Sequence, residues 1–391
     1  MKIGIDARLY GPKQGGLGRY LQQLIEGLEK TDLQNDYVVF LRQENFFAYT
    51  PVNPRFKKAL ADIPWYGWQE QFLLPRILKK ENCDFVHFPH WNIPVFYNKK
   101  FIVTIHDLIL FHYPSRQSST LGPLKYFFKN LAYRFILRHA VKKATQIITP
   151  SNFTKQDVTK NLHVPEEKIT VTYLAPVLKN NIQYPTLPTG RQVSNTNNQQ
   201  NNDKNQEILQ KHGITKNYLL YVGVAYPHKN LERLVRAWKM FEKQNKNFQL
   251  VLVGKKNYFY DRLINSEIFK SCKDVIFTDF ILDENLVDIY KNSSAYIFPS
   301  LYEGFGLPPL EAMQYGIPVI SSNKTCLPEI LGDAALYFEP QNEQDICSKI
   351  NLILTDSDTR QKLINNIPDI LSKYSQKNTA ETTLSVYKKM V

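Results

Sequence analysis

The sequence predicts an α/β protein built from two Rossmann-like, doubly wound domains, and three observations lead to this fold class. Short β-branched and aromatic runs alternate with longer helical segments along nearly the whole chain. The strand-like runs are apolar on both faces, which is typical of parallel strands buried between two layers of helices. The chain has 391 residues, more than one hydrophobic core usually organises.

The predicted elements follow one another in the same way in both halves of the chain. In the first half, strands are predicted at 3–7, 37–41, 85–88, 101–105, 146–149 and 169–173, with helices at 16–30, 66–80, 124–143 and 151–161. In the second half, strands are predicted at 219–222, 249–253, 275–278, 295–298, 318–321 and 335–338. Its helices are expected at 229–244, 258–271, 283–292, 307–315, 342–354 and 358–371.

A segment of different composition separates the two halves. Of the 15 residues from Gln192 to Gln206, 10 are Asn or Gln. Such a segment buries too little apolar surface to offset its ordering entropy, and we expect a disordered insertion with no readable role. The predicted organisation is a first domain over 1–178, the insertion or linker over 179–210, a second domain over 211–374 and a final helix over 375–391.

The charge of the chain is unevenly distributed. The net charge is +13, of which residues 1–187 carry +11 (25 basic, 14 acidic) and residues 188–391 carry +2 (24 basic, 22 acidic). Between Asp107 and Asp157 there are eight Lys or Arg residues and no acidic one. The first half is therefore expected to meet an anionic partner or the cytoplasmic face of a membrane.

Composition excludes several classes of protein. With 43% hydrophobic and 13% aromatic residues, the chain can form a real core, which excludes global disorder. The four cysteines are far apart and form no CxxC pair, so we expect a reducing cytosol rather than disulfides or structural zinc. No signal-peptide core or membrane-spanning run is present. We expect a cytoplasmic protein, soluble or peripheral on the inner face of the membrane.

The segment from Pro299 to Glu311 carries the sharpest chemical pattern. Its loop places Glu303 at the carboxyl edge of a sheet, where ligands bind in open α/β folds. Glu311 lies further along the following helix and can accept hydrogen bonds from a vicinal diol. The first N–H groups of that helix suit an anionic oxygen: those of Phe305, Gly306 and Leu307. The alternative is a pair of surface glutamates beside a helix cap.

A second strand-to-helix turn places basic residues at a helix start. The chain passes from the strand through Gly223 to His228 and Lys229. A cation is unfavourable at a helix N-terminus unless an anion such as a diphosphate lies beside it. The alternative is a lysine that is merely exposed at a turn.

Two features of the first half suggest further site residues. Gly15 and Gly16, after the first strand, allow close approach of the backbone to a phosphate, although the spacing is not that of a dinucleotide-binding GxGxxG loop. His106 follows a buried strand and can donate to a sugar hydroxyl or stabilise developing charge. The alternative for His106 is a structural histidine.

No metal site is expected. His87, His90 and His106 lack an acidic or cysteine ligand at a suitable spacing. The DxD-like triplet Asp356-Ser357-Asp358 lies where a helix begins, and we interpret it as a helix cap.

The helix predicted at 124–143 mixes aromatic and basic residues around its whole circumference. One interpretation is a partly buried helix with basic ends that reach solvent. The other is a surface that docks on an anionic leaflet or a polyprenyl-diphosphate acceptor. The candidate residues for acceptor or membrane contact are His90, Trp65, Trp68, Arg134 and Arg138.

These motifs together resemble retaining glycosyltransferases of family 4, which have the GT-B fold, and in particular bacterial mannosyltransferases of polysaccharide and O-antigen synthesis. The resemblance covers nearly the whole chain apart from the Asn/Gln-rich insertion. It rests on Glu303 and Glu311 (E-x7-E), His228-Lys229-Asn230, Gly15–Tyr20, Ile105-His106-Asp107, Pro150–Thr154, Ser321–Asn323, Leu327–Glu329 and Gly332–Ala335.

The resemblance implies two Rossmann-like domains facing a cleft, with a nucleotide-sugar donor on the second domain, an acceptor on the first, and a C-terminal helix that crosses back to the first. Glu303 would position the donor sugar, Glu311 would hold the ribose and Lys229 would neutralise the diphosphate. Gly16 and the Gly306 region would supply backbone donors, and His106 would lie near the sugar's C6 hydroxyl. Many relatives have arginine at the position of His228, and a neutral imidazole binds an anion more weakly.

The function expected from this resemblance is transfer of a hexose, namely mannose from GDP-mannose, to a saccharide or lipid-linked saccharide without metal or other cofactor. A donor based on UDP or dTDP and a nucleotide-sugar epimerase or phosphorylase of the same fold remain alternatives. A nucleic-acid-binding protein is the alternative from another class. It is disfavoured because the sequence carries no such recognition motif and would leave Glu303 and Lys229 unexplained.

Overall fold

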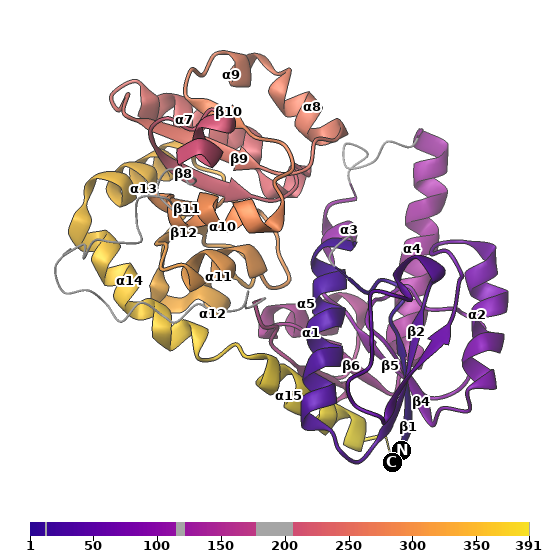
Figure 1. The fold of residues 1–391 in the computed structure, drawn as a ribbon. Coiled ribbons are helices and arrows are strands. Elements are labelled where there is room, and N and C mark those ends of the chain that lie inside the picture. Colours follow the sequence, from indigo (N-terminus) through magenta and orange to yellow (C-terminus); the bar gives the residue numbers. More distant parts are fainter. Residues whose placement is uncertain (12–13, 115–121, 177–205, 391) are drawn as a thin grey trace. The chain divides into compact units, whose positions relative to one another are not determined.

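The computed structural model describes residues 1–11, 14–114, 122–176 and 206–390, and the chain divides into two compact units (Figure 1). The first unit comprises Met1–Val177 and Tyr374–Val391, and the second comprises Leu178–Lys373. Both units are α/β with an all-parallel sheet, as the sequence predicts. Most of the expected insertion, residues 179–205, lies outside the described residues. Residues 206–210, the end of the expected disordered insertion, are instead helical together with residue 211, and Ile208 is buried there.

The sheet of the first unit has the strand order β3-β2-β1-β4-β5-β6-β7. Its strands are β1 (Lys2–Asp6), β2 (Asp36–Leu41), β3 (Phe56–Leu60), β4 (Phe85–Phe88), β5 (Phe101–Thr104), β6 (Gln146–Thr149) and β7 (Ile169–Val171). The order reverses at the β1–β4 pair. Loops that leave the carboxyl ends of these two strands therefore diverge and leave room for a ligand.

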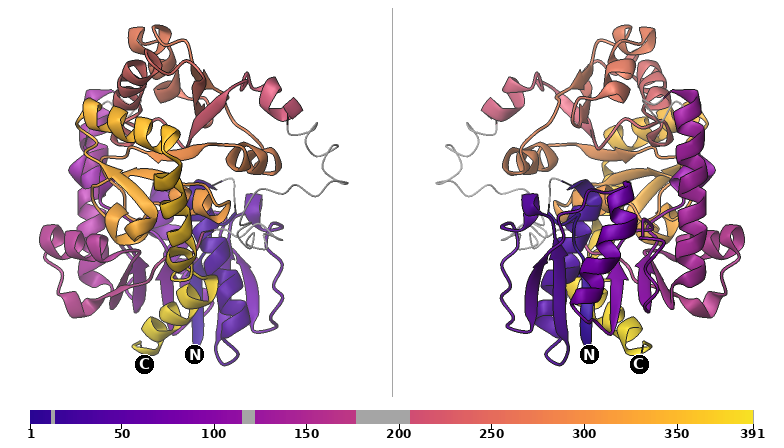
Figure 2. Two further views of the ribbon diagram at one scale, coloured as in Figure 1. Left: turned by 90° about the vertical axis from the view of Figure 1, so that its left-hand side faces the viewer. Right: turned by 90° about the vertical axis from the view of Figure 1, so that its right-hand side faces the viewer.

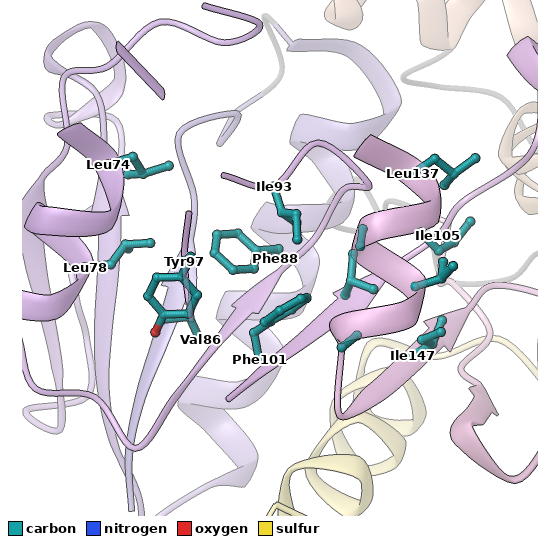
Figure 3. Close-up of a cluster of buried hydrophobic side chains, with 14 of the residues drawn as sticks. Leu74, Leu78, Val86, Phe88, Ile93, Tyr97, Phe101, Ile105, Leu137 and Ile147 are labelled. Atoms are coloured by element: carbon teal, nitrogen blue, oxygen red, sulfur yellow. The ribbon is translucent and has the colours of Figure 1, made fainter. Parts of the chain in front are cut away.

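The helices of the first unit cover both faces of this sheet. They are α1 (Gly15–Thr31), α2 (Trp68–Lys80), α3 (Ile109–His112), α4 (Pro123–Lys143), α5 (Asn152–Leu162) and α15 (Gln376–Lys388). Figure 3 shows the core on one face, where Leu74 of α2 and Leu137 of α4 flank Phe88 and Phe101 of the strands. This core holds α2 and α4 in place on the sheet.

Helix α15 is continuous in sequence with the second unit but packs on the first. It lies beside α1 in both Figure 1 and Figure 2. Gly27 of α1 allows this close approach, since a Cβ there would lie 3.0 Å from the Cβ of Ala380. The expected C-terminal helix that crosses back to the first domain is confirmed.

The sheet of the second unit has the strand order β10-β9-β8-β11-β12-β13. The strands are β8 (Asn217–Val222), β9 (Phe248–Val253), β10 (Val275–Phe277), β11 (Ala295–Phe298), β12 (Val319–Ser322) and β13 (Ala335–Phe338). Its helices are α7 (Leu231–Glu242), α8 (Tyr258–Ile264), α9 (Glu267–Lys270), α10 (Asp283–Lys291), α11 (Leu307–Gln314), α12 (Leu327–Leu331), α13 (Glu343–Thr355) and α14 (Ser357–Leu371). The order reverses at β8 and β11, the two strands that precede the predicted donor-binding loops.

Candidate active site

The carboxyl ends of β8 and β11 bring two predicted site residues into contact. Lys229 ends the short 3-10 turn η5 (Pro227–Lys229) after β8, and Glu303 lies in the loop after β11. The Nζ of Lys229 is 2.5 Å from Oε1 of Glu303, and the two side chains are only 15% and 10% exposed. Residues 74 positions apart thus form an ion pair at the point where the strand order reverses.

The backbone of the two loops is joined directly. The N–H of Leu301 donates to the carbonyl oxygen of His228 at 2.7 Å. Asn230 lies in the left-handed region (φ 62°), which asparagine tolerates better than most residues. Its amide donates to the carbonyl oxygens of Pro299 (3.2 Å) and Pro340 (2.7 Å). These bonds fix Lys229 and Glu303 relative to each other before any ligand binds.

Thr325 and Cys326 hold the Glu303 loop from the other side, and the sequence reasoning missed both. The N–H of Glu303 donates to Oγ1 of Thr325 at 3.2 Å. The thiol of Cys326 donates to the carbonyl oxygens of Glu303 and Phe305, each at 3.3 Å. Burial raises the pKa of Cys326 well above its usual value, so the group stays a neutral donor. No local pattern marks these two residues, because their role depends on the packing of α12 against the loop.

Helix α11 begins directly after this loop, with Gly306 as its N-cap. Gly306 has φ 95°, and a Cβ there would approach Cδ2 of Leu327 to 2.9 Å, so both backbone and space require glycine. The backbone of Phe305 and Leu307 flanks this N-cap, at the positive end of the helix dipole. Glu311, which is half-buried, lies on the next turn.

His228 is buried and uncharged beside the ion pair. Burial, reinforced by the charge of Lys229, lowers the pKa of its imidazole to about 4, and the carboxylate of Glu303 opposes this only weakly. The ring stacks on Tyr226, with centroids 5.9 Å apart. A neutral ring of this kind can offer an anion a hydrogen bond but no charge. Gly223, at the end of β8, accepts a hydrogen bond from the Tyr260 hydroxyl through its carbonyl oxygen at 2.8 Å.

In the first unit, His106 follows β5 and is held through one ring nitrogen. Its Nε2 lies 2.9 Å from the carbonyl oxygen of Pro89, which can only accept, so Nε2 carries the proton. Burial lowers the pKa of His106 to about 4. The remaining nitrogen, Nδ1, is therefore a hydrogen-bond acceptor. The sequence suggested that this ring donates to a sugar hydroxyl. In this geometry the proton is on Nε2 and is used by Pro89, so the free Nδ1 can accept a hydrogen bond but cannot donate one.

A buried polar chain links His106 to the C-terminal helix. The ring of Tyr20 packs edge-on against His106, with centroids 4.7 Å apart, and its hydroxyl lies 3.4 Å from Oγ1 of Thr104. Thr104 is 2.8 Å from Nε2 of His87, whose Nδ1 is 2.8 Å from the hydroxyl of Tyr387 on α15. These buried contacts restrict the movement of the His106 ring.

The glycine loop of the first unit has two different parts. Gly15 and Gly16 open α1, and a Cβ at either position would meet no atom within 4 Å. Gly18 instead packs tightly, since a Cβ there would lie 2.0 Å from the carbonyl oxygen of Gly11. The backbone at Gly15 and Gly16 is thus open to a ligand, whereas Gly18 is required by the fold.

The loops after β1 and β4 contain a buried charge cluster that the sequence did not reveal. Arg8, which is 1% exposed, binds both oxygens of Asp6 and one oxygen of Glu70 from α2. Burial alone would lower the pKa of Arg8, and the two carboxylates more than reverse this. Glu70 also accepts from the N–H of Tyr66 and from the amide of Asn92. The cluster shapes the surroundings of His90, which follows β4.

The predicted acceptor-side residues lie around this region of the first unit. Trp65 stacks under the guanidinium of Arg42 at 4.6 Å, and Trp68 is 81% exposed at the start of α2. Arg134 of α4 donates to the carbonyl oxygen of Phe111 and lies over its ring, whereas Arg138 is exposed. These residues all belong to the first unit, whereas Lys229 and Glu303 belong to the second.

The triplet Asp356-Ser357-Asp358 lies at the start of α14 and caps it through Asp356, as expected. The side chain of Asp356 accepts from the N–H of Asp358. Within the described ranges, no cluster of three or more His, Cys, Asp or Glu side chains is arranged to hold a metal ion. Among the described helices, none has both the length and the apolar character needed to cross a membrane.

Both halves of the chain match families of known proteins. Residues 14–175 match the model described as glycosyltransferase family 4, and residues 204–369 match the model described as glycosyl transferases group 1. The chain is a glycosyltransferase whose first half belongs to family 4 and whose second half belongs to group 1. Its two parallel-sheet units correspond to the GT-B fold, and the predicted resemblance to glycosyltransferases of family 4 is confirmed.

Relatives of this glycosyltransferase include proteins of O-antigen synthesis. It is 27% identical over 317 residues to the O-antigen chain mannosyltransferase RfbU of Salmonella typhimurium, across 81% of this chain and 74% of that protein. It is 26% identical over 291 residues to the O-antigen chain mannosyltransferase B of Escherichia coli, across 73% and 70%. Sucrose-phosphate synthase from Thermosynechococcus elongatus shares its fold, with a TM-score of 0.72 at 17% identity, over 100% of this chain and 99% of that one.

Proposed function

We propose that this glycosyltransferase moves mannose from GDP-mannose to a saccharide or lipid-linked saccharide in cell-surface polysaccharide synthesis, with retention of the anomeric configuration. The observation that carries the proposal is the Lys229–Glu303 ion pair at the β8–β11 reversal, beside the N-terminus of α11. This arrangement offers a cation, a carboxylate and backbone donors on one preformed support. A nucleoside diphosphate joined to a polyhydroxylated ring requires the same set of groups.

In the proposed reaction, Lys229 and Glu303 give up their contact with each other and bind the donor instead. Lys229 binds the diphosphate and neutralises the charge that grows on it as the glycosidic bond breaks. Glu303 accepts hydrogen bonds from the sugar hydroxyls, and Glu311 accepts them from the ribose. The amides at the N-terminus of α11 face the leaving oxygens. Fixed donors of this kind lower a barrier by about 3 kcal/mol each when charge develops at them.

The first unit is proposed to bind the acceptor. His106 presents Nδ1 to a sugar hydroxyl, and its neutral state suits this role because an imidazolium has no acceptor. Gly15 and Gly16 are proposed instead to offer an open backbone to phosphate oxygens of the donor. The excess charge of this part of the chain, +11 over residues 1–187, favours an anionic acceptor.

The choice of mannose and GDP is supported by the names of the relatives, which are mannosyltransferases of O-antigen chains. We propose that no metal is needed, since Lys229 and the α11 N-terminus supply positive charge at the diphosphate. We place the reaction in the cytoplasm or on the inner face of the membrane. The four cysteines in the structure are all free thiols, which is typical of a reducing compartment.

The first experiment is a thermal-shift screen of GDP-, UDP- and dTDP-sugars, because a ligand that binds the native state raises the melting temperature. GDP-mannose is expected to give the largest rise. A larger rise with a UDP- or dTDP-sugar would overturn the proposed donor. Consumption of the donor without an acceptor would indicate an epimerase or phosphorylase instead, and transfer that persists in EDTA supports metal independence.

The site itself is tested by Lys229→Ala and Glu303→Gln. Each is expected to reduce transfer by about 10²–10³-fold, since each removes a group that acts where charge develops. Lys324→Ala is the matched control, because Lys324 forms an ion pair of the same length with Glu339 in the same unit but half-exposed. Wild-type rates in either site variant would contradict the assignment.

A further inference from the structure

Helix α4 has one apolar face inside the protein and a second one outside. Tyr133, Leu137 and Ala140 are buried in the core of the first unit. Five large apolar residues on the helix are instead between 56% and 69% exposed: Leu124, Phe127, Phe128, Leu131 and Phe135. Their spacing of three and four residues places them along one side of the helix, a surface that we call the α4 stripe. The sequence showed apolar residues all round this helix, and the structure separates them into two faces.

The α4 stripe lies on the part of α4 that extends furthest from the core. Figures 1 and 2 show the N-terminal turns of α4 reaching beyond the other helices of its unit. An exposed patch of five large apolar side chains normally marks a binding surface. The charged residues of α4 are all basic, and residues 108–156 contain no acidic side chain at all. An apolar stripe with basic flanks matches an anionic lipid surface.

An apolar cavity of about 580 Å³ lies beside this helix, within the first unit. Its walls come from the start of α2, the loop after β4, and α4. Aromatic and aliphatic residues dominate the lining: Tyr66, Trp68, Trp91, Tyr126, Tyr133 and Ile136. Lys129 is the one charged residue among the described residues that line it. The volume lies within the range of sites that bind small organic ligands, and the lining suits a hydrocarbon chain with an anionic end.

A second hollow of only about 10 Å³ adjoins the apolar cavity. The two share Tyr66 and Asn92, and the small hollow is also lined by Asp6, Arg8 and His90. Oδ1 of Asn92 is buried without a hydrogen-bond partner. An unpaired buried acceptor is costly, so a ligand hydroxyl that donates to it would be favoured. The hollow has room for one water or one hydroxyl group, so a ligand in the apolar cavity can place a single hydroxyl against Asn92.

We infer that the cavity between α2 and α4 holds the hydrocarbon chain of an anionic lipid that carries the acceptor saccharide, while the α4 stripe enters the bilayer. The inference rests on the proposed function for the identity of the saccharide acceptor, but lipid binding itself does not require a donor. A second copy of the chain is a poorer occupant, because two copies of this acid-free basic face would repel each other.

Vesicle binding tests the α4 stripe. The full chain is mixed with phosphatidylcholine vesicles with and without phosphatidylglycerol, and bound protein is separated by flotation. The wild type is expected to bind the anionic vesicles, and a Phe127→Ser/Phe128→Ser/Phe135→Ser variant is expected to bind more than about tenfold less. Phe47→Ser is the matched control, since Phe47 is an exposed aromatic residue of the same unit outside the stripe. Equal binding by all three proteins would overturn the inference.

Occupation of the cavity is tested separately, with phosphatidylglycerol that carries brominated acyl chains. Bromine quenches tryptophan, and two tryptophans of the chain, Trp68 and Trp91, line the cavity. Strong quenching is expected in the wild type and weak quenching in Ala132→Phe, which narrows the cavity but leaves the stripe intact. Equal quenching would show that no chain enters. Vesicle-free dimerisation in analytical ultracentrifugation that is lost in the triple variant would overturn the inference in favour of a second copy.

The outcome of these tests is independent of the proposed chemistry. Donor-induced thermal shifts are expected to be the same in the triple variant, Ala132→Phe and the wild type. Loss of lipid binding with an unchanged donor shift separates the membrane surface from the donor site. Vesicle binding without any donor shift would support the lipid inference and count against the proposed glycosyl transfer.

Discussion

The two units of this glycosyltransferase share one architecture but place different chemistry at the point where their strand order reverses. In the second unit, the loops after β8 and β11 bring Lys229 and Glu303 together beside a helix N-terminus. In the first unit, the loops after β1 and β4 hold a buried arginine with two carboxylates and lead to the uncharged His90. The reversal point of the second unit thus carries a single ion pair, whereas that of the first unit carries a buried cluster of three charges and the neutral His90.

The difference extends to the surfaces of the units. The second half of the sequence is nearly balanced in charge and contains Lys229, the cation proposed to bind a diphosphate. The first half carries most of the net positive charge, and the α4 stripe adds exposed apolar residues to it. The proposed function and the lipid inference together assign a small charged ligand to the second unit and an amphiphile to the first. The following predictions test this contrast.

Acid is expected to unfold the first unit before the second. Burial lowers the pKa of His87 and His90 to about 3 and that of His106 to about 4, all in the first unit, while His228 is the corresponding residue of the second. An unfolded histidine titrates near 6.5, so the stability that these rings provide is complete above pH 6.5 and is lost as the pH falls toward 4. At pH 4.5 each ring costs the native state about 2 kcal/mol.

Hydrogen exchange followed by mass spectrometry at pH 7 and pH 4.5 checks this prediction segment by segment. The strands of the first unit should lose protection first. Carboxylates with a lowered pKa do not bias the comparison, because Asp32 and Glu81 lie in one unit and Glu339 and Asp356 in the other. Earlier loss of protection in β8 and β11 would show that histidine burial does not decide which unit unfolds first in acid.

Arg8→Met is expected to destabilise the first unit by about 3–5 kcal/mol, since it leaves Asp6 and Glu70 buried without a counter-charge. Urea unfolding followed by hydrogen exchange in β1 and α2 measures the loss. Arg236→Met is the control in the second unit, where Arg236 pairs with Glu232 on an exposed helix face. This change should shift stability by no more than about 0.5 kcal/mol. Similar losses in both variants would refute the distinction between a buried and a surface pair.

The two parallel sheets were predictable from sequence, but the edge strand β3 was missed. The predicted strands were continuous apolar runs, whose pattern is strong because both faces are buried. β3 (Phe56–Leu60) contains Lys57 and Lys58, as edge strands often do to prevent further pairing, and this breaks the apolar run. Position at the edge of a sheet is a property of the whole fold and leaves only a weak local signal.

The candidate site was predictable to a similar extent. Lys229 and Glu303 each follow a strand in a glycine-containing turn, so the sequence pointed to both, and strand order then places them side by side. Thr325 and Cys326 were missed because their partners are distant in sequence, and the ion pair of Arg8 with Glu70 was missed for the same reason. The position of the proton on His106 could not be predicted from the sequence either, since it depends on the carbonyl oxygen of Pro89.

Tyr387→Phe is expected to give the smallest effect, about 1–3 kcal/mol, because it removes one hydrogen bond and leaves Nδ1 of His87 buried without a partner. Hydrogen exchange should increase in α15 and β4 and stay unchanged in the second unit. Glu381→Ala, which removes only a surface pair with Lys377 on the same helix, should have no measurable effect. Increased exchange in the second unit of Tyr387→Phe would show that the two units are not independent in stability.

The central claim is that Lys229 of the second unit binds the diphosphate of the donor. Isothermal titration calorimetry with GDP and with guanosine tests it most directly, because the two ligands differ only in that group. Wild type is expected to bind GDP much more tightly than guanosine, and Lys229→Ala should lose about tenfold or more of that preference. Glu303→Gln, which leaves the cation in place, should retain it. An unchanged preference for GDP in Lys229→Ala would contradict the account.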